Sequence, residues 1–467
     1  MKIQEGGNIF KKLRLIRMLV ITALAIAVLF PQALLAAGPK NVIFVIGDGL
    51  ANAQRRAAEE ILETKLVMNT LPVVGMYTTQ CLDAIITDSA AAGTALATGN
   101  KTNSGVISMD PEGKMAYETV AEAAKRMGKS VGLISTMRIT HATPATFGAH
   151  VSSRSEETKI AKQYLEQGFE VYMGGGISNF IPKSAKGSKR KDDLDLLKAF
   201  SDAGYDVLKS KDDLMKLSVS KDTKVLGLFT SSHMPFHLDR PENVPSLSEM
   251  TEMAIKVLSQ NPKGFFLMVE GGKLDMACHA NDPVATVANT AELDNAVQKA
   301  MDFRKQDADT LIFVGGDHET GGMGLGLGLD YFLKTDVIKN AKKTYEWVGN
   351  TYSKKGGDPV ALMTEATGIT DFSDAEIEAI KTAAANVTAK KKFANSYNRN
   401  WLAATYADIL SKRSHVGWTT WAHTANPVMV TLIGPGSEAF GGYYDNVEPA
   451  RKLSSLWGVS LKSWKME

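Results

Sequence analysis

The stretch NVIFVIGDG, residues 41–49, contains an apolar run that ends at Gly47 and is followed by the acidic Asp48. An apolar run without polar alternation is typical of a strand buried on both faces of a parallel sheet. Similar runs recur at residues 130–135, 169–173, 264–269, 310–314 and 428–433. Segments with helical character lie between them, at residues 118–126, 246–258 and 284–304. The alternation predicts an α/β fold with a largely parallel central sheet sandwiched by helices.

The first 37 residues differ from the rest of the chain. A basic stretch leads into an apolar run from Met18 to Phe30, and small residues follow at Ala36 and Ala37. This order is typical of a secretory signal peptide, and the run is shorter than the ~20 residues of a membrane-spanning helix. An uncleaved N-terminal anchor is the alternative. We therefore expect a periplasmic or secreted protein without stable membrane association, whose single domain covers residues 38–467.

The alternation of strands and helices breaks between about residues 321 and 413. This stretch is rich in glycine at first and then mostly helical and rich in lysine. Ser373 and Glu376 in it have the spacing of a capping box, which starts a helix. The pattern predicts a helical insertion that packs over the core.

Charge and cysteine content exclude some classes of protein. The whole chain has a net charge of +2, and its first 37 residues hold five basic residues and one acidic residue, so the remainder has a net charge of −2. A near-neutral protein lacks the electrostatic footprint of nucleic-acid binding. Two cysteines, Cys81 and Cys278, do not make a disulfide framework. We expect buried free thiols, with pairing as the alternative.

Charged side chains follow three of the predicted strands. These residues are Asp48, Glu270, and the pair Asp317 and His318. Parallel α/β sheets bind ligands at the carboxyl ends of their strands, and a buried strand has no packing reason to end in a charge. After Glu270, a predicted loop offers Asp275 and, four residues later, His279. Oxygen and nitrogen ligands at such spacings can surround divalent metals, although solvated loop residues would explain either group alone.

Ser89 precedes an alanine-rich run that Gly99 closes, so the sequence predicts a helix with Ser89 at its N-terminus. Unpaired N–H groups favour an anion there, although an ordinary helix cap would explain the serine alone. No histidine adjoins Ser89 in the sequence as a general base, so a nucleophilic serine would need a metal for its activation. Arg154 follows His141 and Thr143, and its guanidinium could hold phosphate oxygens.

The order of these motifs resembles the alkaline phosphatase family from about Lys40 to Gly436, nearly the whole chain after the leader. The motifs that carry the resemblance are Asp48 in VIGDG, Ser89 in DSAA, His141 and Thr143 in HATP, Arg154 in HVSSR, Glu270 with Asp275 and His279, Asp317 with His318, and His423 in HT. The family carries a variable, crown-like insertion where residues 321–413 stand, and its members are commonly homodimers.

The resemblance implies a function and a set of ligands. Small phosphate monoesters would be hydrolysed through a phosphoserine at Ser89, with Arg154 on the phosphate. The implied ligands are Asp275, His279 and His423 for one zinc ion; Asp48, Asp317, His318 and the deprotonated Ser89 for a second; and Asp48, Thr143 and Glu270 for a magnesium ion beside His141.

Two positions depart from the bacterial pattern, and several alternatives remain. His141 stands where some bacterial members have Asp, and Met276 stands where they have Lys, so the third metal could be zinc or a weakly bound magnesium ion. His415 is the alternative to His423 as the last zinc ligand. A phosphodiesterase on the same fold, or a non-catalytic phosphate- or metal-binding protein, are the alternative functions. Ser89 is not followed by the proline and arginine of a sulfatase.

Overall fold

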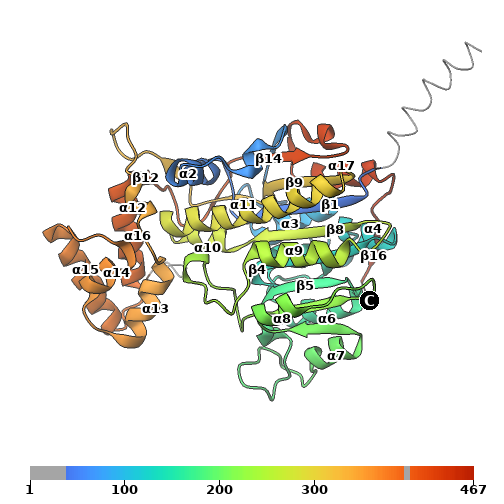
Figure 1. Cartoon of the computed structure of the whole chain (residues 1–467), viewed down its shortest axis with the longest axis horizontal. Helices are drawn as coiled ribbons and strands as arrows, with labels where there is room; N and C mark the ends of the chain where they lie inside the picture. The colour runs from blue at the N-terminus through green and yellow to red at the C-terminus, as the bar shows by residue number, and fades with distance from the viewer. Residues whose placement is uncertain (1–37, 394–399, 467) are drawn as a thin grey trace, which may run out of the picture.

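The computed structural model describes residues 38–393 and 400–466, and a ten-stranded sheet forms its centre (Figure 1). The strand order is β15-β2-β14-β9-β1-β8-β4-β5-β7-β6. The bounds of these strands are β1 (Asn41–Gly47), β2 (Val73–Thr78), β4 (Ser130–Arg138), β5 (Val171–Gly175), β6 (Tyr205–Leu208), β7 (Lys224–Leu228), β8 (Phe265–Gly271), β9 (Thr310–Gly316), β14 (Val428–Ile433) and β15 (Gly442–Asp445). The predicted signal peptide, residues 1–37, lies outside the described residues.

Most neighbouring strands run parallel. β1 pairs in parallel with β8 on one side and β9 on the other, and all seven of its residues are buried. β14 is antiparallel to both β9 and β2. Its direction could not be read from the sequence, because a strand buried on both faces shows the same apolar run in either orientation. The predicted α/β class with a largely parallel sheet is confirmed.

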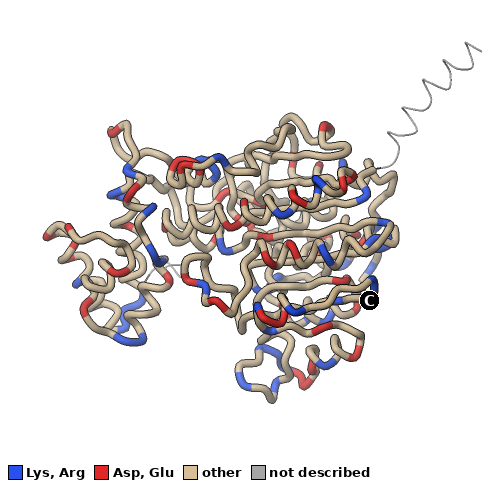
Figure 2. Tube along the Cα trace, viewed as in Figure 1, with Lys and Arg blue, Asp and Glu red and all other residues tan. Residues whose placement is uncertain are grey.

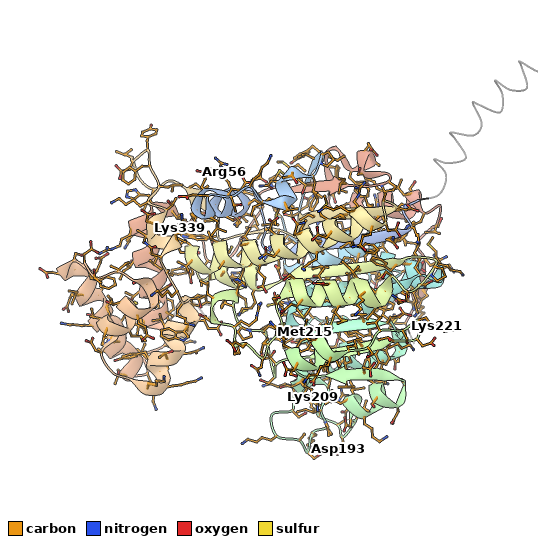
Figure 3. The ribbon with its side chains drawn as sticks, in the orientation of Figure 1. Arg56, Asp193, Lys209, Met215, Lys221 and Lys339 are labelled. Carbon is orange, nitrogen blue, oxygen red and sulfur yellow. The ribbon has the colours of Figure 1, made fainter. Side chains whose placement is uncertain are left out.

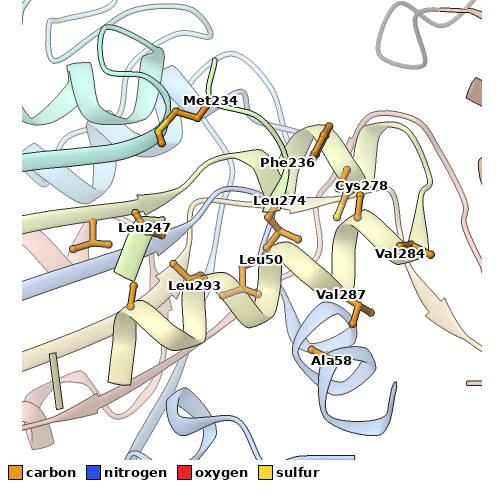
Figure 4. Close-up of a cluster of buried hydrophobic side chains, with 14 of the residues drawn as sticks. Leu50, Ala58, Met234, Phe236, Leu247, Leu274, Cys278, Val284, Val287 and Leu293 are labelled. Atoms are coloured by element: carbon orange, nitrogen blue, oxygen red, sulfur yellow. The ribbon is translucent and has the colours of Figure 1, made fainter. Parts of the chain in front are cut away.

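Helices cover both faces of the sheet. They are α2 (Asn52–Leu62), α3 (Ser89–Thr98), α4 (Val120–Arg126), α5 (Ala142–Gly148), α6 (Glu157–Gln167), α7 (Leu196–Asp202), α8 (Lys211–Lys216), α9 (Leu247–Leu258), α10 (Lys273–His279), α11 (Pro283–Gln306) and α17 (Glu448–Leu456). Alternate side chains of β1 enter two different buried clusters. Val45 belongs to the cluster that contains Leu247 and Leu293, shown in Figure 4, and Phe44 belongs to the cluster that contains Phe147.

Most helix starts follow the expected capping chemistry. Ser373 and Glu376 form the predicted capping box at α15 (Asp374–Thr388). At α3 the cap is Asp88, whose side chain accepts a hydrogen bond from the amide of Ala91. The reading of Ser89 as an ordinary cap is therefore wrong, because Ser89 is the first helical residue. Gly99 ends α3 with a positive φ of 71°, as expected.

Four further helices and α15 make up most of the predicted insertion. They are α12 (Asp336–Lys339), α13 (Tyr345–Lys355), α14 (Pro359–Thr367) and α16 (Trp401–Ser414). Figure 1 shows α13, α14 and α15 in orange beside the sheet. Two short antiparallel ladders join the ends of this segment, β10 (Glu319–Thr320) with β13 (His423–Thr424), and β11 (Gly324–Leu325) with β12 (Val416–Gly417). The first ladder brings His423 opposite Thr320, close to the end of β9.

The surface carries both signs of charge. Figure 2 shows Lys and Arg interspersed with Asp and Glu along the chain trace. A surface ion pair also links α12 to the end of α2, since Lys339 Nζ lies 3.0 Å from Glu63 Oε2, and Figure 3 shows Lys339 on the same side of the molecule as Arg56. A two-stranded sheet of β3 (Met115–Tyr117) and β16 (Ser463–Lys465) lies near the C-terminus. Across the described ranges, no helix is both long and apolar enough to cross a membrane.

One buried ion pair connects the 232–245 segment to α11. The guanidinium of Arg240 meets both carboxylate oxygens of Glu292, and each side chain is no more than 6% exposed. Burial acts to raise the pKa of Glu292, but Arg240 outweighs it, and the pKa lies below its usual value.

We expect Arg240→Met to lower the free energy of unfolding at pH 7 by about 3–5 kcal/mol, because it leaves a buried carboxylate without its partner. A lowered pKa means that the ion pair stabilises the fold above the unfolded pKa of ~4.3 and that this contribution disappears as the pH falls through the folded pKa. Urea unfolding at pH 7 and below pH ~4 measures the difference. Adding Glu292→Gln should recover most of the loss, and an unchanged unfolding free energy in Arg240→Met would contradict the assignment.

Candidate active site

The acidic residues predicted at the strand ends lie at one edge of the sheet. Asp48 follows β1, Glu270 is near the end of β8, and Asp317 follows β9. Because β1 lies between β8 and β9, their carboxyl ends place these three buried side chains side by side. After β8, the chain forms α10 rather than the predicted loop. The helix starts directly after Gly271 and Gly272, which had suggested a loop, and it brings Asp275 and His279 to one face at i, i+4 spacing.

The first of three clusters consists of Asp275, His279 and His423. The Nε2 atoms of His279 and His423 lie 3.1 Å apart. His279 Nε2 lies 3.3 Å from Asp275 Oδ2, and His423 Nε2 lies 3.5 Å from Asp275 Oδ1. Each ring uses its Nδ1 elsewhere: His279 Nδ1 lies 2.6 Å from the carbonyl oxygen of Trp421 and His423 Nδ1 lies 2.7 Å from that of Thr87. These contacts aim both Nε2 atoms into the cluster, as outer partners of metal-bound histidines do.

The second cluster consists of Asp48, Asp317 and His318. His318 Nε2 lies 3.4 Å from Asp48 Oδ1 and 3.2 Å from Asp317 Oδ2. Asp317 Oδ1 accepts hydrogen bonds from the amides of Gly49 and His318, which orients the other oxygen inward. Gly49 has a φ of 75°, and an added Cβ would lie only 2.9 Å from Thr320 Oγ1. A glycine is therefore required beside Asp48 for the tight turn at this strand end.

The third cluster consists of Asp48, His141 and Glu270, so Asp48 belongs to two clusters. Thr143 Oγ1 lies 3.5 Å from Asp48 Oδ2. Glu270 Oε2 accepts a hydrogen bond from Ser135 Oγ, which leaves Oε1 directed to the cluster. His141 is the residue before α5, and Thr143 is in its first turn.

The donor atoms of all three clusters fit divalent metals. Within each cluster the ligand atoms lie within 4.8 Å of one another. Four buried atoms at the site have no hydrogen-bond partner among the described residues: Asp48 Oδ1, His141 Nδ1, Glu270 Oε1 and Asp317 Oδ2. Buried polar atoms are rarely left unpaired, and a bound cation satisfies lone pairs of this kind. Carboxylate oxygens and imidazole nitrogens are suitable ligands for zinc, and carboxylate and hydroxyl oxygens for magnesium.

The carboxylates repel one another when no cation is present. Burial, and then the charges of Asp317 and Asp275, raise the pKa of Asp48 well above its usual value. Burial raises the pKa of Glu270 to about 8, and burial with the charge of Asp275 raises that of Asp317 to about 7. Burial also acts to raise the pKa of Asp275, but His279 and His423 outweigh it and hold that pKa well below its usual value. So much buried negative charge is stable only beside cations.

Two histidines are held in the neutral form that binds metals. Burial, and then the positive charge of His423, lower the pKa of His318 well below its usual value. Burial, and then Arg154, do the same for the pKa of His141. Neutral rings have a free nitrogen lone pair at physiological pH, so both residues can act as ligands without first losing a proton.

Ser89 lies beside the second cluster, at the start of α3. Its Oγ is 3.2 Å from His318 Nε2, and the residue is only 2% exposed. Arg154 reaches the same place: Nη1 donates to Asp88 Oδ2 at 2.9 Å and Nη2 lies 3.2 Å from His141 Nε2. Asp88 therefore fixes both the helix start and the guanidinium. The site combines a serine, a cation, a helix N-terminus and three groups of metal-binding atoms.

The structure brings together every predicted site residue, and their roles stay predictions. The residues are Asp48, Ser89, His141, Thr143, Arg154, Glu270, Asp275, His279, Asp317, His318 and His423. His415 instead ends α16 and lies 3.5 Å from Asp330. Both cysteines are free and buried, and Cys278 points into the apolar cluster of Figure 4 with its Sγ near Thr286.

Several residues that orient the site were not recognised from the sequence. Asp88 positions Arg154, and Thr320 Oγ1 donates to Asp275 Oδ1 at 2.7 Å. Ser135 binds Glu270, and backbone carbonyls of Thr87 and Trp421 hold two histidines. Among them, only Asp88 has a recognisable pattern in the sequence, because an acidic residue directly before a helix is a typical N-cap. The carbonyl contacts have no side-chain signature.

Comparison with known proteins agrees with this geometry. The alkaline phosphatase family model matches residues 39–458. Alkaline phosphatase 3 of Bacillus subtilis is 37% identical over 438 residues, which cover 91% of this chain and 90% of that protein. The crystal structure of Thermus thermophilus alkaline phosphatase superposes with a TM-score of 0.81 at 29% identity, covering 93% and 94% of the two chains. A cold-active alkaline phosphatase from Shewanella sp. superposes with a TM-score of 0.79 at 30% identity, covering 89% and 99%.

Oxygen and nitrogen donors around one serine, at the carboxyl edge of a largely parallel sheet, are the arrangement of a metal-dependent phosphoryl-transfer enzyme. Because the family model matches nearly the whole described chain, the class of enzyme can be narrowed to one family. The chain belongs to the alkaline phosphatase family and is a phosphomonoesterase.

Proposed function

We propose that the chain hydrolyses phosphate monoesters in two steps through a phosphoserine at Ser89. The observation that carries the proposal is the position of Ser89 Oγ, which lies 3.2 Å from His318 Nε2 at the N-terminus of α3. Arg154 contacts Asp88, the residue before Ser89, and His141 of the third cluster. A nucleophile, a phosphate-binding cation and metal-binding atoms therefore surround one small volume.

The metals are part of the proposal. One zinc ion would be held by Asp275, His279 and His423, a second by Asp48, Asp317 and His318 together with Ser89, and a third ion by Asp48, Thr143 and Glu270 beside His141. Bound there, divalent cations would lower the pKa of the Ser89 hydroxyl and stabilise negative charge on the leaving oxygen. His141 adds a nitrogen donor at the third site, which favours zinc over magnesium more than an oxygen donor would.

The residues of the chain then perform the following steps. Ser89 Oγ, without its proton, attacks phosphorus, and the bond from phosphorus to the alcohol oxygen breaks. Arg154 binds the equatorial phosphate oxygens in bidentate fashion, held in place by Asp88. The N–H groups at the start of α3 add positive potential where the phosphate charge lies. Water then attacks the phosphoserine, and inorganic phosphate leaves as the Ser89 hydroxyl is restored.

Arg154 also favours monoesters over the alternative, diesters. A monoester has a second negative charge and a third non-bridging oxygen, so one oxygen remains for the metals when the guanidinium binds two, whereas a diester has only two non-bridging oxygens and one charge. The alternative of a non-catalytic binding protein is disfavoured because the nucleophile and every proposed ligand are in place.

The test is hydrolysis of p-nitrophenyl phosphate, bis-p-nitrophenyl phosphate and p-nitrophenyl sulfate by purified, metal-loaded protein. We expect monoester hydrolysis to be faster by several orders of magnitude and to stop when the metals are removed by chelation. Arg154→Gln should raise KM for the monoester and reduce its advantage over the diester, because it removes two charge-assisted hydrogen bonds of about 1.5–3 kcal/mol each. A faster diester in the wild type, with metals bound, would contradict the proposal.

A further inference from the structure

A cavity of about 490 Å³ lies between the core and α13. We call it the crown cavity; its lining includes His233, Phe236, Lys273, Trp347, Lys354 and Lys355. One wall is the segment before η3 (His237–Asp239), and the other is α13, which Figure 1 shows beside the yellow-green part of the core. Its size is that of a small-molecule site.

The inner end of the crown cavity adjoins the proposed phosphate site. The ring of His233 packs edge-on against that of His141, with centroids 5.3 Å apart, and His141 contacts Arg154. Lys273 is the first residue of α10, the helix that also carries Asp275 and His279. Its Nζ lies 3.6 Å from the sulfur of Met276, the neighbour of Asp275. His233 and Lys273 thus belong both to the lining of the cavity and to the immediate surroundings of the site.

The inner charges of the crown cavity are matched by protein groups. Lys273 Nζ lies 3.2 Å from Glu346 Oε2 and 3.6 Å from the centre of the Phe236 ring. Asp239 accepts hydrogen bonds from the amide and hydroxyl of Thr344, the cap of α13. The two acidic residues of the lining are therefore engaged with Lys273 and with the helix start.

The outer end of the crown cavity is basic. Lys354 and Lys355 are exposed, and neither forms an ion pair with a residue in the described ranges. They share one face of α13 with Glu346, Trp347, Asn350 and Thr351, since these residues recur at i, i+4 and i+8. Eight residues of helix separate Glu346 from Lys354, which is about 12 Å. The face thus offers an aromatic wall, two polar groups and then two cations.

We propose that the crown cavity binds the distal part of an elongated phosphate monoester whose alcohol carries a second anionic group, a carboxylate or a phosphate. The scissile phosphate binds at Ser89 and Arg154, the body of the alcohol lies along Trp347, and the second anion reaches Lys354 and Lys355. The inference rests on the proposed function and adds to it a class of substrate.

The test compares ω-phosphooxy carboxylates with their methyl esters, which keep the shape and lose the distal charge. Chain lengths run from about six to about sixteen carbon atoms, because the substrate must cross the ~12 Å between Glu346 and Lys354 in addition to the path from Ser89 to the cavity. In the wild type, kcat/KM for the longer carboxylates should exceed that of the matched esters by roughly three- to tenfold, the effect of two exposed ion pairs. The shortest pair should show no such difference.

Lys354→Gln with Lys355→Gln should bring the carboxylate-to-ester ratio to about one and leave the kcat/KM of p-nitrophenyl phosphate unchanged. The matched control is Lys209→Gln with Lys221→Gln, two exposed lysines that Figure 3 places on other parts of the surface. It removes the same net charge and should keep the wild-type ratio. A ratio near one in the wild type, or a ratio that survives in the α13 variant, would overturn the inference.

Failure of the proposed function gives a different result. It would show as absent hydrolysis of p-nitrophenyl phosphate, whatever the distal group. Calorimetric titration of the same carboxylates and esters into the Ser89→Ala protein measures their affinity ratio without turnover. Tighter binding of the carboxylate than of the ester, lost when Lys354 and Lys355 are replaced, would support anion binding at the crown cavity even without hydrolysis. Equal affinities of the carboxylate and the ester would contradict it.

Discussion

Replacing Ser89 with alanine is expected to lower kcat for p-nitrophenyl phosphate by on the order of 10³–10⁵, because no phosphoserine can form and only direct attack by water remains. The residue contributes one oxygen at the start of α3, whereas the carboxylates and histidines of the three clusters stay in place. The metal content of the protein should therefore fall little, although Ser89 is one of the proposed ligands of the second ion. Steady-state kinetics together with elemental analysis of the same preparation measure both quantities.

The control for this change is Ser155→Ala, which removes the same hydroxyl from an exposed residue next to Arg154. It should retain nearly all activity. If Ser89→Ala kept more than a tenth of the wild-type kcat with full metal content, Ser89 would not be the nucleophile. If Ser89→Ala lost both activity and most of its metal, the loss of activity would follow from the loss of metal at the second cluster. The expectation that Ser89 contributes little to metal binding would then be wrong.

Asp48→Asn is expected to have the second largest effect, because Asp48 belongs to two clusters. Losing its charge weakens the second and third metal sites together, so kcat should fall by on the order of 10³ or more, while the cluster of Asp275, His279 and His423 keeps its ion. Elemental analysis should show a larger loss of metal than in Asp275→Asn, which touches one cluster. Equal losses in the two variants would contradict the shared position of Asp48.

The same substitution should stabilise the metal-free protein. The pKa of Asp48 is raised by burial and by the neighbouring carboxylates. A raised pKa means that its contribution to stability is full below the unfolded pKa of ~3.9 and is lost as the pH rises through the folded pKa. The metal-free wild type should therefore become less stable as the pH rises from ~4, and Asp48→Asn should flatten that decline. Thermal unfolding after chelation measures it, with the exposed Asp206→Asn as a control.

The fold was predictable where strands are buried on both faces. β1, β8 and β9 are continuous apolar runs, so their positions and the parallel class followed from the sequence. β2 was missed because Gly75 interrupts it and its burial alternates, and β6 was missed because it is a four-residue edge strand with an exposed Asp206. These strands depend on their neighbours in the sheet more than on their own composition.

The candidate site was predictable as a set of residues but only partly as an arrangement. Strand ends placed Asp48, Glu270 and Asp317 together through the general geometry of parallel sheets. His423 was assigned only through the resemblance to the family. It reaches Asp275 through the pairing of β10 with β13, and strands of two residues cannot be predicted from the sequence. The crown cavity could not be predicted, because its lining comes from three segments that are distant in the sequence, and their contact depends on how α13 packs.

The most direct test of the account is to stop the reaction with acid during turnover of p-nitrophenyl phosphate and to map the peptides by mass spectrometry. We expect the peptide containing Ser89 to gain the mass of one phosphoryl group, and this modified peptide to disappear in Ser89→Ala and in the chelated protein. Rapid hydrolysis with no phosphoryl group on Ser89, or with the group on another residue, would contradict the account.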